Sequence, residues 1–444
     1  MRTTLLATLV VSMFAASPAH ATDPAEVDRR LDALMKEIES LKAEVARMKA
    51  EKAAAPAVAP VAPVAPAASA APTKPTPVDI ARATGEAPKL FEQVEKTTFF
   101  GYGELNYYRP THDTSNTTAD AARVVLGFEH RWNERTRLVT ELEWEHAVTS
   151  VDDRGESEVE QAYVEYMINQ NLSTKVGLFL MPVGLLNEHH EPTQYYGVAR
   201  NFVETAIIPT TWREGGLLLH GNYDSGLSWD AGISTGFDLS KWDATSTEGQ
   251  ESPLGSIHQE LQLAKAKDLS AFGALNYRGV PGLLVGASIF SGKAGQGTPD
   301  FPAPDARVTI WDAHARWTPG DFDIWALYTR GHISDTANLN VTLVGNPTLV
   351  PEDFFGWYMQ GAFKIWNQGE MSATPFVRYE RYNTGWKYAT LPAGLTPDAL
   401  PTEGVWTAGL NFYLNPSVVF KMDYQKFKED TTRDRFDLGV GYQF

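Results

Sequence analysis

Charged side chains recur at every second position in several segments of this chain. Examples are Glu141, Glu143 and Glu145, and further along Lys421 and Asp423. A spacing of two places such residues on one face of a β-strand. Rows of both signs on facing walls would create a transverse field across a water-filled space, which orients charged solutes and tunes ion selectivity. The same residues could instead pair with one another and stiffen the wall, and the sequence leaves both interpretations open.

The segment 181–212 is a second place where ionisable side chains gather. The candidate residues in it and directly after it are Glu188, His189, His190, Glu191, Arg200 and Arg213. Carboxylates and imidazoles can bind a divalent metal, but adjacent side chains of an extended loop point apart, so we expect neither a metal site nor a cofactor. Titration of Glu188 to Glu191 could also gate a pore by charge. We favour a third interpretation, in which these residues form hydrogen bonds that hold the loop against a wall.

Alternation of apolar and polar residues indicates which elements carry these groups. It recurs from Lys96 to Phe444 in stretches of about ten residues, as in membrane-spanning β-strands. In the last stretch Leu438, Val440 and Tyr442 share one face with Phe444, and polar or small residues fill the other face. A strand between lipid and a wet interior has this pattern. Together with the aromatic residue at the end, it points to a bacterial outer-membrane barrel.

The alternating region divides into about sixteen strand-like segments. They are 97–108, 121–132, 135–146, 158–168, 172–180, 213–222, 226–237, 266–278, 281–291, 306–317, 321–331, 354–366, 371–382, 403–414, 417–428 and 433–444. Short connections with turn residues alternate with mostly long ones, as expected for periplasmic turns and external loops. An even number of strands places both ends of the barrel in the periplasm.

Within a barrel, alternation assigns each strand residue to lipid or to the lumen, because a charge on the lipid side costs about 2–4 kcal/mol at the bilayer midplane. In 135–146, Leu138, Leu142 and Trp144 face lipid, which turns the charged residues between them inward. The alternation does not orient the segment around Trp325 and Tyr328. The predicted pore-lining residues are Glu104, Arg123, Arg131, Arg137, Glu141, Glu143, Glu145, Asp312, His314, Arg316, Arg378, Glu380, Lys421 and Asp423.

Three stretches precede the barrel domain, which we place at 96–444. Residues 1–21 have the charge, short apolar core and small residues of a cleaved signal peptide. Residues 53–95 form a linker that begins rich in Pro and Ala and is extended there. Residues 22–52 are predicted to form a periplasmic coiled coil, with a single amphipathic helix as the alternative. The coiled-coil positions are Val27, Leu31, Leu34, Ile38, Leu41, Val45 and Met48.

Composition limits the partners of the chain. A formal net charge of -17 argues against nucleic acid as a partner. The Cys count is 0, so no disulfide or thiolate metal site can form. The predicted fold class is therefore an all-β transmembrane barrel of about 16 antiparallel strands with an N-terminal α-helical coiled-coil segment.

Residues 95–444 resemble the phosphate-selective porin O/P family of outer-membrane proteins. The resemblance rests on Gly177-Leu178-Phe179, Pro182-Val183-Gly184-Leu185, residues 188–191, Arg213 with Gly215-Gly216, Gly409-Leu410-Asn411 and residues 439–444. It implies a sixteen-stranded, trimeric barrel in which a ladder of arginines and a central lysine selects phosphate. Inward basic residues are present, but Glu141, Glu143 and Glu145 mean that they form no ladder free of carboxylates. The N-terminal extension resembles that of dicarboxylate-type porins.

These observations predict an outer-membrane porin for passive diffusion of small hydrophilic solutes, with anions such as phosphate or dicarboxylates as the expected cargo. The alternative is a structural tether from the outer membrane to the cell wall through the coiled coil. An enzyme is not expected, because outward His130 and His146 lack a serine partner on a neighbouring strand. The expected partners are outer-membrane lipid and lipopolysaccharide, two further copies in a homotrimer, the barrel assembly machinery through Phe444, and peptidoglycan within reach of the coil.

Overall fold

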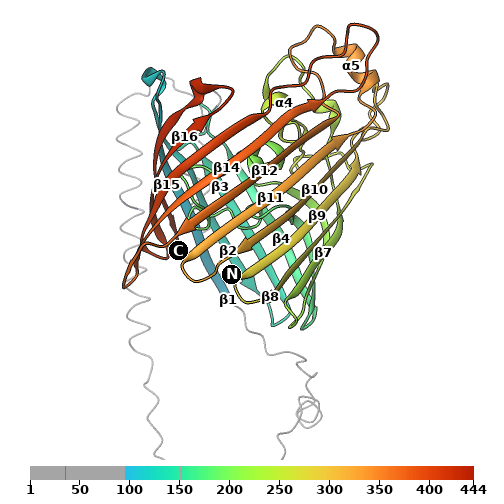
Figure 1. Ribbon diagram of the computed structural model, residues 1–444. Coiled ribbons are helices and arrows are strands. Elements are labelled where there is room, and N and C mark those ends of the chain that lie inside the picture. Colours follow the sequence, from blue (N-terminus) through green and yellow to red (C-terminus); the bar gives the residue numbers. More distant parts are fainter. Residues whose placement is uncertain (1–35, 37–95, 151–152) are drawn as a thin grey trace, which may run out of the picture. The chain divides into compact units, whose positions relative to one another are not determined.

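Strand pairing closes on itself in the computed structural model, which describes Lys36, residues 96–150 and residues 153–444. One antiparallel sheet contains all the strands, and its first strand pairs with both the second and the last (Figure 1). The sheet has seventeen strand segments. Because β12 and β13 both pair with β14, they count as one, which confirms the predicted barrel of sixteen strands.

The strands are β1 (Lys96–Pro110), β2 (Thr118–Arg131), β3 (Thr136–Glu145), β4 (Ser157–Asn169), β5 (Leu172–Leu180), β6 (Arg213–Asn222), β7 (Leu227–Ser234), β8 (Ser270–Val280), β9 (Leu283–Lys293), β10 (Arg307–Trp317), β11 (Phe322–Ile333), β12 (Asp353–Phe363), β13 (Trp366–Gln368), β14 (Met371–Lys387), β15 (Glu403–Asn415), β16 (Val418–Phe427) and β17 (Arg435–Gln443). The signal peptide, the coiled coil and the linker were placed on residues 1–95. These three predictions lie outside the described residues, apart from Lys36.

Connections of two lengths alternate around the barrel. Short turns such as 281–282 and 318–321 lie at one end, which we call the short-turn end, and long loops lie at the other, the long-loop end (Figure 1). The loops carry short helices, and within the described residues no helix has the length and apolar content to cross a membrane. These helices are η1 (Thr114–Asn116), η2 (Val203–Ile207), η3 (Leu239–Lys241), α4 (Glu248–Glu251), η4 (Gly255–Ile257), α5 (Ala337–Leu343) and η5 (Thr431–Arg433).

Two of the strands that differ from their predicted ranges do so for local reasons. The segment 354–366 is interrupted after Phe363, where the N–H of Lys364 donates to the carbonyl of Asp321 in a neighbouring turn. The segment 226–237 leaves the sheet after Ser234, because Phe237 turns into the barrel. Its ring lies 5.1 Å from that of Trp212 and 5.4 Å from that of Phe290.

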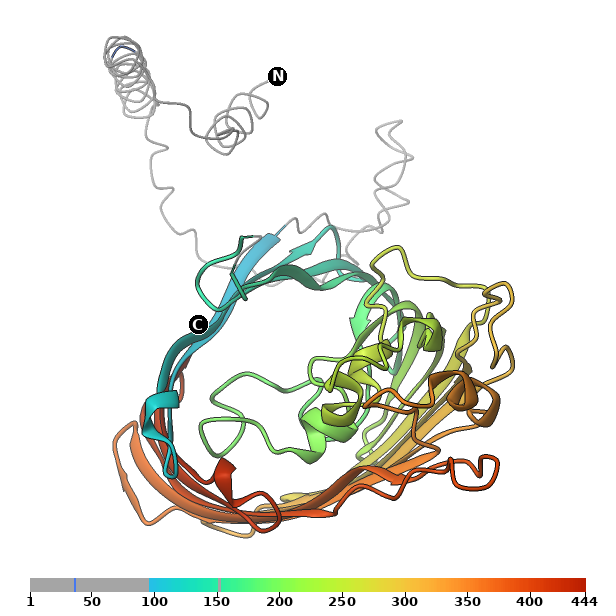
Figure 2. The same cartoon turned by 90° about the horizontal axis from the view of Figure 1, so that it is seen from above.

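Apolar packing lies inside the barrel as well as outside it. The fully buried rings of Trp212, Phe237 and Phe290 belong to a cluster between the strands and the segments that fold inward after β5 and β7. Figure 2 shows these segments, in green, inside the ring of strands. The core therefore joins the wall to the long loops, and it fixes where the loops lie in the lumen.

The outer face of the strands exposes a belt of apolar side chains. A monomeric protein in water rarely exposes so large a continuous apolar surface, whereas a barrel in lipid presents one all round. Members of this belt are between 40% and 58% exposed: Leu105, Leu126, Val176, Ile233, Leu275, Ile289, Met359, Val377, Phe420 and Leu438. Exposed aromatic residues such as Trp132, Tyr166, Tyr223 and Trp317 gather near the short-turn end, where an interfacial girdle is expected.

A charge placed in this belt should destabilise the barrel in lipid. Leu126 is 41% exposed in the middle of β2, and the substitution Leu126→Arg is expected to lower the free energy of unfolding in phospholipid vesicles. The expected loss is about 2–4 kcal/mol, measured by urea titration. The matched control is Leu263→Arg, at a fully exposed position in the loop between β7 and β8. Equal losses in the two variants would contradict a lipid-facing belt.

Candidate functional site

Residues 181–212, which we call the inward loop, leave β5 at Leu180 and return to the wall at Arg213. The loop crosses the lumen rather than extending beyond the barrel (Figure 2). Its backbone and side chains hydrogen-bond to strands on several sides of the lumen, including β1, β10, β12, β14 and β16. The cross-section of the lumen is therefore set by how these strands hold the loop.

On the β1 side, the buried ion pair of Glu104 and Arg123 holds the loop, and both members of the pair form hydrogen bonds with it. Glu104 accepts hydrogen bonds from Arg123 Nε at 2.7 Å and from the hydroxyl of Tyr195 at 2.6 Å. The guanidinium of Arg123 also donates to the carbonyl of His190. Burial, and then the carboxylate of Glu104, raise the pKa of Tyr195 well above its usual value. Tyr195 thus remains a hydrogen-bond donor, and Lys421 Nζ lies 3.5 Å from the centre of its ring.

The buried imidazole of His190 faces the wall formed by β1 and β4. Its Nε2 lies 2.7 Å from the hydroxyl of Tyr102 and 3.4 Å from a carboxylate oxygen of Glu160. Its Nδ1 lies 2.9 Å from the carbonyl oxygen of Asn187, within the same loop. Burial lowers the pKa of His190, although the carboxylate of Glu160 acts in the opposite direction. His190 therefore packs into the wall, away from the open lumen.

Two strand carboxylates accept backbone hydrogen bonds from the far part of the loop. Asp423 on β16 accepts from the N–H of Val198 at 2.6 Å, and Glu380 on β14 accepts from the N–H of Phe202 at 2.6 Å. Arg378 donates to Glu380 at 3.1 Å and to the carbonyl of Tyr196 at 3.2 Å.

A carboxylate of β10 holds the start of the loop. Asp312 accepts from the N–H of Gly184 at 3.1 Å and lies 2.6 Å from His314 Nδ1.

The remaining predicted residues lie in several separate places. At the short-turn end, Glu129 pairs with Arg131 at 2.6 Å and with Arg137 at 2.7 Å. Glu141 accepts from Gln161 Nε2 at 2.6 Å. Glu143 is buried 4.0 Å from Arg123, and Glu145 is half-buried at the end of β3.

Two predicted arginines lie where the inward loop returns to the wall. Arg213 lies 2.9 Å from Glu260, and Arg200 donates to Thr211 at 2.9 Å.

The four residues 188–191 do not converge. Glu188 and His189 are exposed, Glu191 is half-buried, and His190 is buried against the wall. Throughout residues 96–150 and 153–444, no group of three or more His, Asp and Glu side chains is placed to hold a metal ion.

Glu204 is an anchor that sequence reasoning missed. Its Oε1 accepts from the N–H groups of Leu185 and Leu186, at 2.6 and 2.8 Å. Its Oε2 accepts from Tyr358 at 2.8 Å and from Asn201 at 2.9 Å. One carboxylate thus ties the start of the loop to its middle and to β12. A single glutamate in a long loop carries no signal of this role, because its partner on the strand is 154 positions away.

Comparison with known proteins gives a fold and no family. No family model matches the chain. A protein of Aquifex aeolicus (strain VF5), described as uncharacterized, is 26% identical over 370 residues, which are 81% of this chain and 82% of that protein. OmpF of Salmonella typhi, in complex with daunomycin, is 16% identical with a TM-score of 0.53, over 79% of this chain and 98% of that one.

DcaP of Acinetobacter baumannii, an outer membrane channel, is 13% identical with a TM-score of 0.48, over 79% of this chain and 97% of that one. The likeness to OmpF, together with the closed barrel of sixteen strands, shows a porin fold. Membership of the phosphate-selective porin O/P family stays a prediction.

Loss of the Glu204 carboxylate should loosen the loop while the barrel persists. In Glu204→Gln, the amide nitrogen cannot accept the hydrogen bonds that one carboxylate oxygen accepts now. Hydrogen bonds to a charged group contribute about 1.5–3 kcal/mol, so the amides of 181–190 should exchange with solvent deuterium at least about tenfold faster.

The control for this variant is Glu188→Gln, which changes an exposed carboxylate in the same loop. It should leave the exchange of these amides close to that of the original protein, as measured by mass spectrometry of peptides from the folded protein. Unchanged exchange in Glu204→Gln would contradict the anchoring role.

Proposed function

We propose that this protein is a porin of the bacterial outer membrane, through which small hydrophilic solutes diffuse passively and chemically unchanged. Small anions such as phosphate or dicarboxylates are the proposed cargo. The observation that carries the proposal is the inward loop, held inside a closed barrel by buried side chains of the wall. A barrel with an apolar outer belt and a polar inner wall suits lipid outside and water inside.

The anchoring supports passive diffusion rather than a moving gate. Glu104, Glu380 and Asp423, on three different strands, accept hydrogen bonds from different parts of the loop. Moving the loop out of the lumen would break all of these at once and leave several charged groups without partners, which is costly in a buried setting. A loop fixed in this way leaves a constriction of constant size, which suits passage by diffusion.

The proposed preference for anions is supported by the compensation of negative charges on the wall. The carboxylate of Glu104 is paired with Arg123, and those of Asp312 and Asp423 accept N–H groups of the loop. We further propose a homotrimer, with lipopolysaccharide around the long-loop end and recognition of Phe444 by the barrel assembly machinery. These partners are proposed from the sequence resemblance and from the outer-membrane location.

Planar-bilayer recording tests the proposal directly. The purified protein should give steady open conductance, and the reversal potential in a salt gradient should have the sign of an anion-preferring channel. Absence of any open conductance would overturn the channel function. A cation-preferring reversal potential would overturn the anion preference and leave the channel function intact.

A single introduced cysteine provides a second test, because the chain has no Cys of its own. Gln194 is an exposed residue of the inward loop, so Gln194→Cys should react with a water-soluble methanethiosulfonate reagent and lose conductance. The control is Leu395→Cys, at an exposed position in the loop between β14 and β15, where reaction should leave conductance unchanged. Full reaction at position 194 with unchanged current would show that solutes do not pass this part of the loop.

A further inference from the structure

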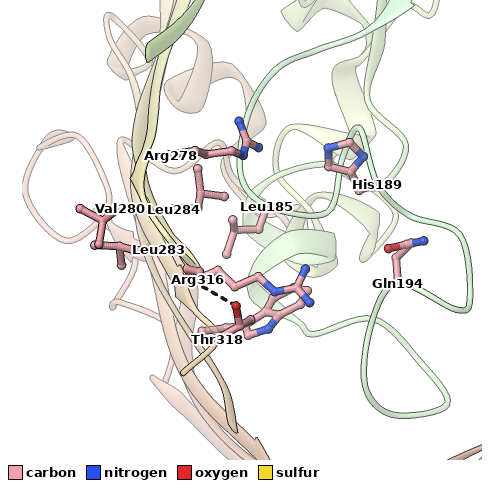
Figure 3. A pocket seen from close by; sticks show the side chains of 11 residues that line it. Leu185, His189, Gln194, Arg278, Val280, Leu283, Leu284, Arg316 and Thr318 are labelled. Atoms are coloured by element: carbon pink, nitrogen blue, oxygen red, sulfur yellow. Dashed lines mark hydrogen bonds between the residues drawn. The ribbon is translucent and has the colours of Figure 1, made fainter. Parts of the chain in front are cut away.

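A pocket of about 490 Å³ lies between the inward loop and the wall at the short-turn end (Figure 3). On the wall side, Arg278 on β8, Leu284 on β9 and Arg316 on β10 line it in sequence around the barrel. Leu284 pairs directly with Arg316, and Arg316 with Trp325 on β11. Neighbouring strands lie about 4.8 Å apart, so the backbones of Arg278 and Arg316 are separated by about 10 Å.

The charge of this pocket is opposite to that of the chain as a whole. The formal net charge of the protein is -17. The pocket is nevertheless lined by Arg278, Arg316 and His189 with neutral residues, and none of its lining residues is Asp or Glu. A positively charged surface recessed in a narrow space concentrates anions, because low-dielectric walls focus the field.

The two arginines differ in whether a neighbouring side chain pairs with the guanidinium. Arg316 is held in place, since its Nε and Nη2 donate to Asp323 at 3.0 and 2.8 Å and its guanidinium lies 4.4 Å from the ring centre of Trp325. Arg278 is exposed, and among the residues that the structure describes its guanidinium has neither a hydrogen-bond nor an ion-pair partner. Figure 3 shows its side chain directed into the pocket, on the side of His189. Arg278 therefore supplies the uncompensated charge.

Apolar side chains complete the pocket. Leu284 lies between the two arginines on the wall, Trp325 lies beyond Arg316, and Leu185 approaches from the inward loop. Gln194 on the loop adds a neutral hydrogen-bonding group opposite them (Figure 3). A guanidinium matches the two oxygens of a carboxylate with paired hydrogen bonds, and an aromatic or aliphatic body gains from contact with Leu side chains.

We infer that this pocket is a binding subsite for a small organic carboxylate with an apolar body, which pairs with Arg278 and packs against Leu284 and Leu185. The inference rests on the proposed channel function and narrows its cargo. The subsite lies on the short-turn side of the inward loop, so a solute meets it on one side of the constriction only. Arg316, fixed by Asp323, adds a donor at the edge of the site.

Block of single-channel current by benzoate tests the subsite, with chloride as the carrier. Benzoate is expected to interrupt the current of the original protein at lower concentration than inorganic phosphate does, because phosphate lacks an apolar body. In Arg278→Gln, half-maximal block should need about tenfold more benzoate, as expected when a charge-assisted hydrogen bond is lost. Arg278→Lys keeps the charge without the planar fork and should fall between the two.

The matched control is Arg307→Gln, which removes the same charge from the opposite end of β10, at an exposed position. Benzoate should block the current of this variant at the same concentration as in the original protein. Equal sensitivity to benzoate in Arg278→Gln and the original protein, or block by phosphate equal to that by benzoate, would overturn the subsite while the open conductance still supports the channel. An original protein without conductance would instead overturn the proposed function.

Discussion

Closure of the sheet is the constraint on which the rest of the structure depends. A lipid-exposed strand edge would leave a row of N–H and C=O groups without partners, so only a closed ring of strands is stable there. The ring closes where β1 meets β17, and beyond the last strand Phe444 exchanges two backbone hydrogen bonds with Gly101, at 2.9 and 3.2 Å. A Cβ atom at Gly101 would lie 2.8 Å from the ring of Phe444, so the absence of a side chain allows this close contact.

Closure also determines where polar groups can be used. With lipid outside, charged strand residues at the middle of the bilayer must face the lumen, and the inward loop then becomes the protein surface available to pair with them. This explains why buried pairs such as Glu104 with Arg123 also contact the loop. A buried ion pair is weak evidence for stability, because desolvation opposes the attraction. The better-supported role of these buried pairs is to hold the loop in one conformation among the many that it could adopt.

The sequence predicts the wall well and the loop poorly, because the two depend on contacts of different range. Alternation is local, and the segment 213–222 coincides with β6. The path of the inward loop depends on contacts such as Val198 with Asp423, which are 225 positions apart. Trp325 is ambiguous in sequence, since an aromatic ring suits either face. The structure settles its direction, because its indole N–H donates to buried Asp323 at 2.7 Å. Arg278 follows Ala274 and Asn276 at a spacing of two, a signal that alternation could have used.

Net charge is a poor guide to what such a channel prefers. Acidic residues dominate the chain, yet many lie on exposed connections, as Asp243 and Asp305 do, or accept hydrogen bonds from the inward loop, as Asp423 does. Salt screens exposed charges on the loops within about 8–10 Å. A solute inside the barrel responds mainly to charges along its own path that no neighbour compensates. An acidic protein can therefore present a basic interior, because pairing and position, rather than the sum of charges, determine the field in the lumen.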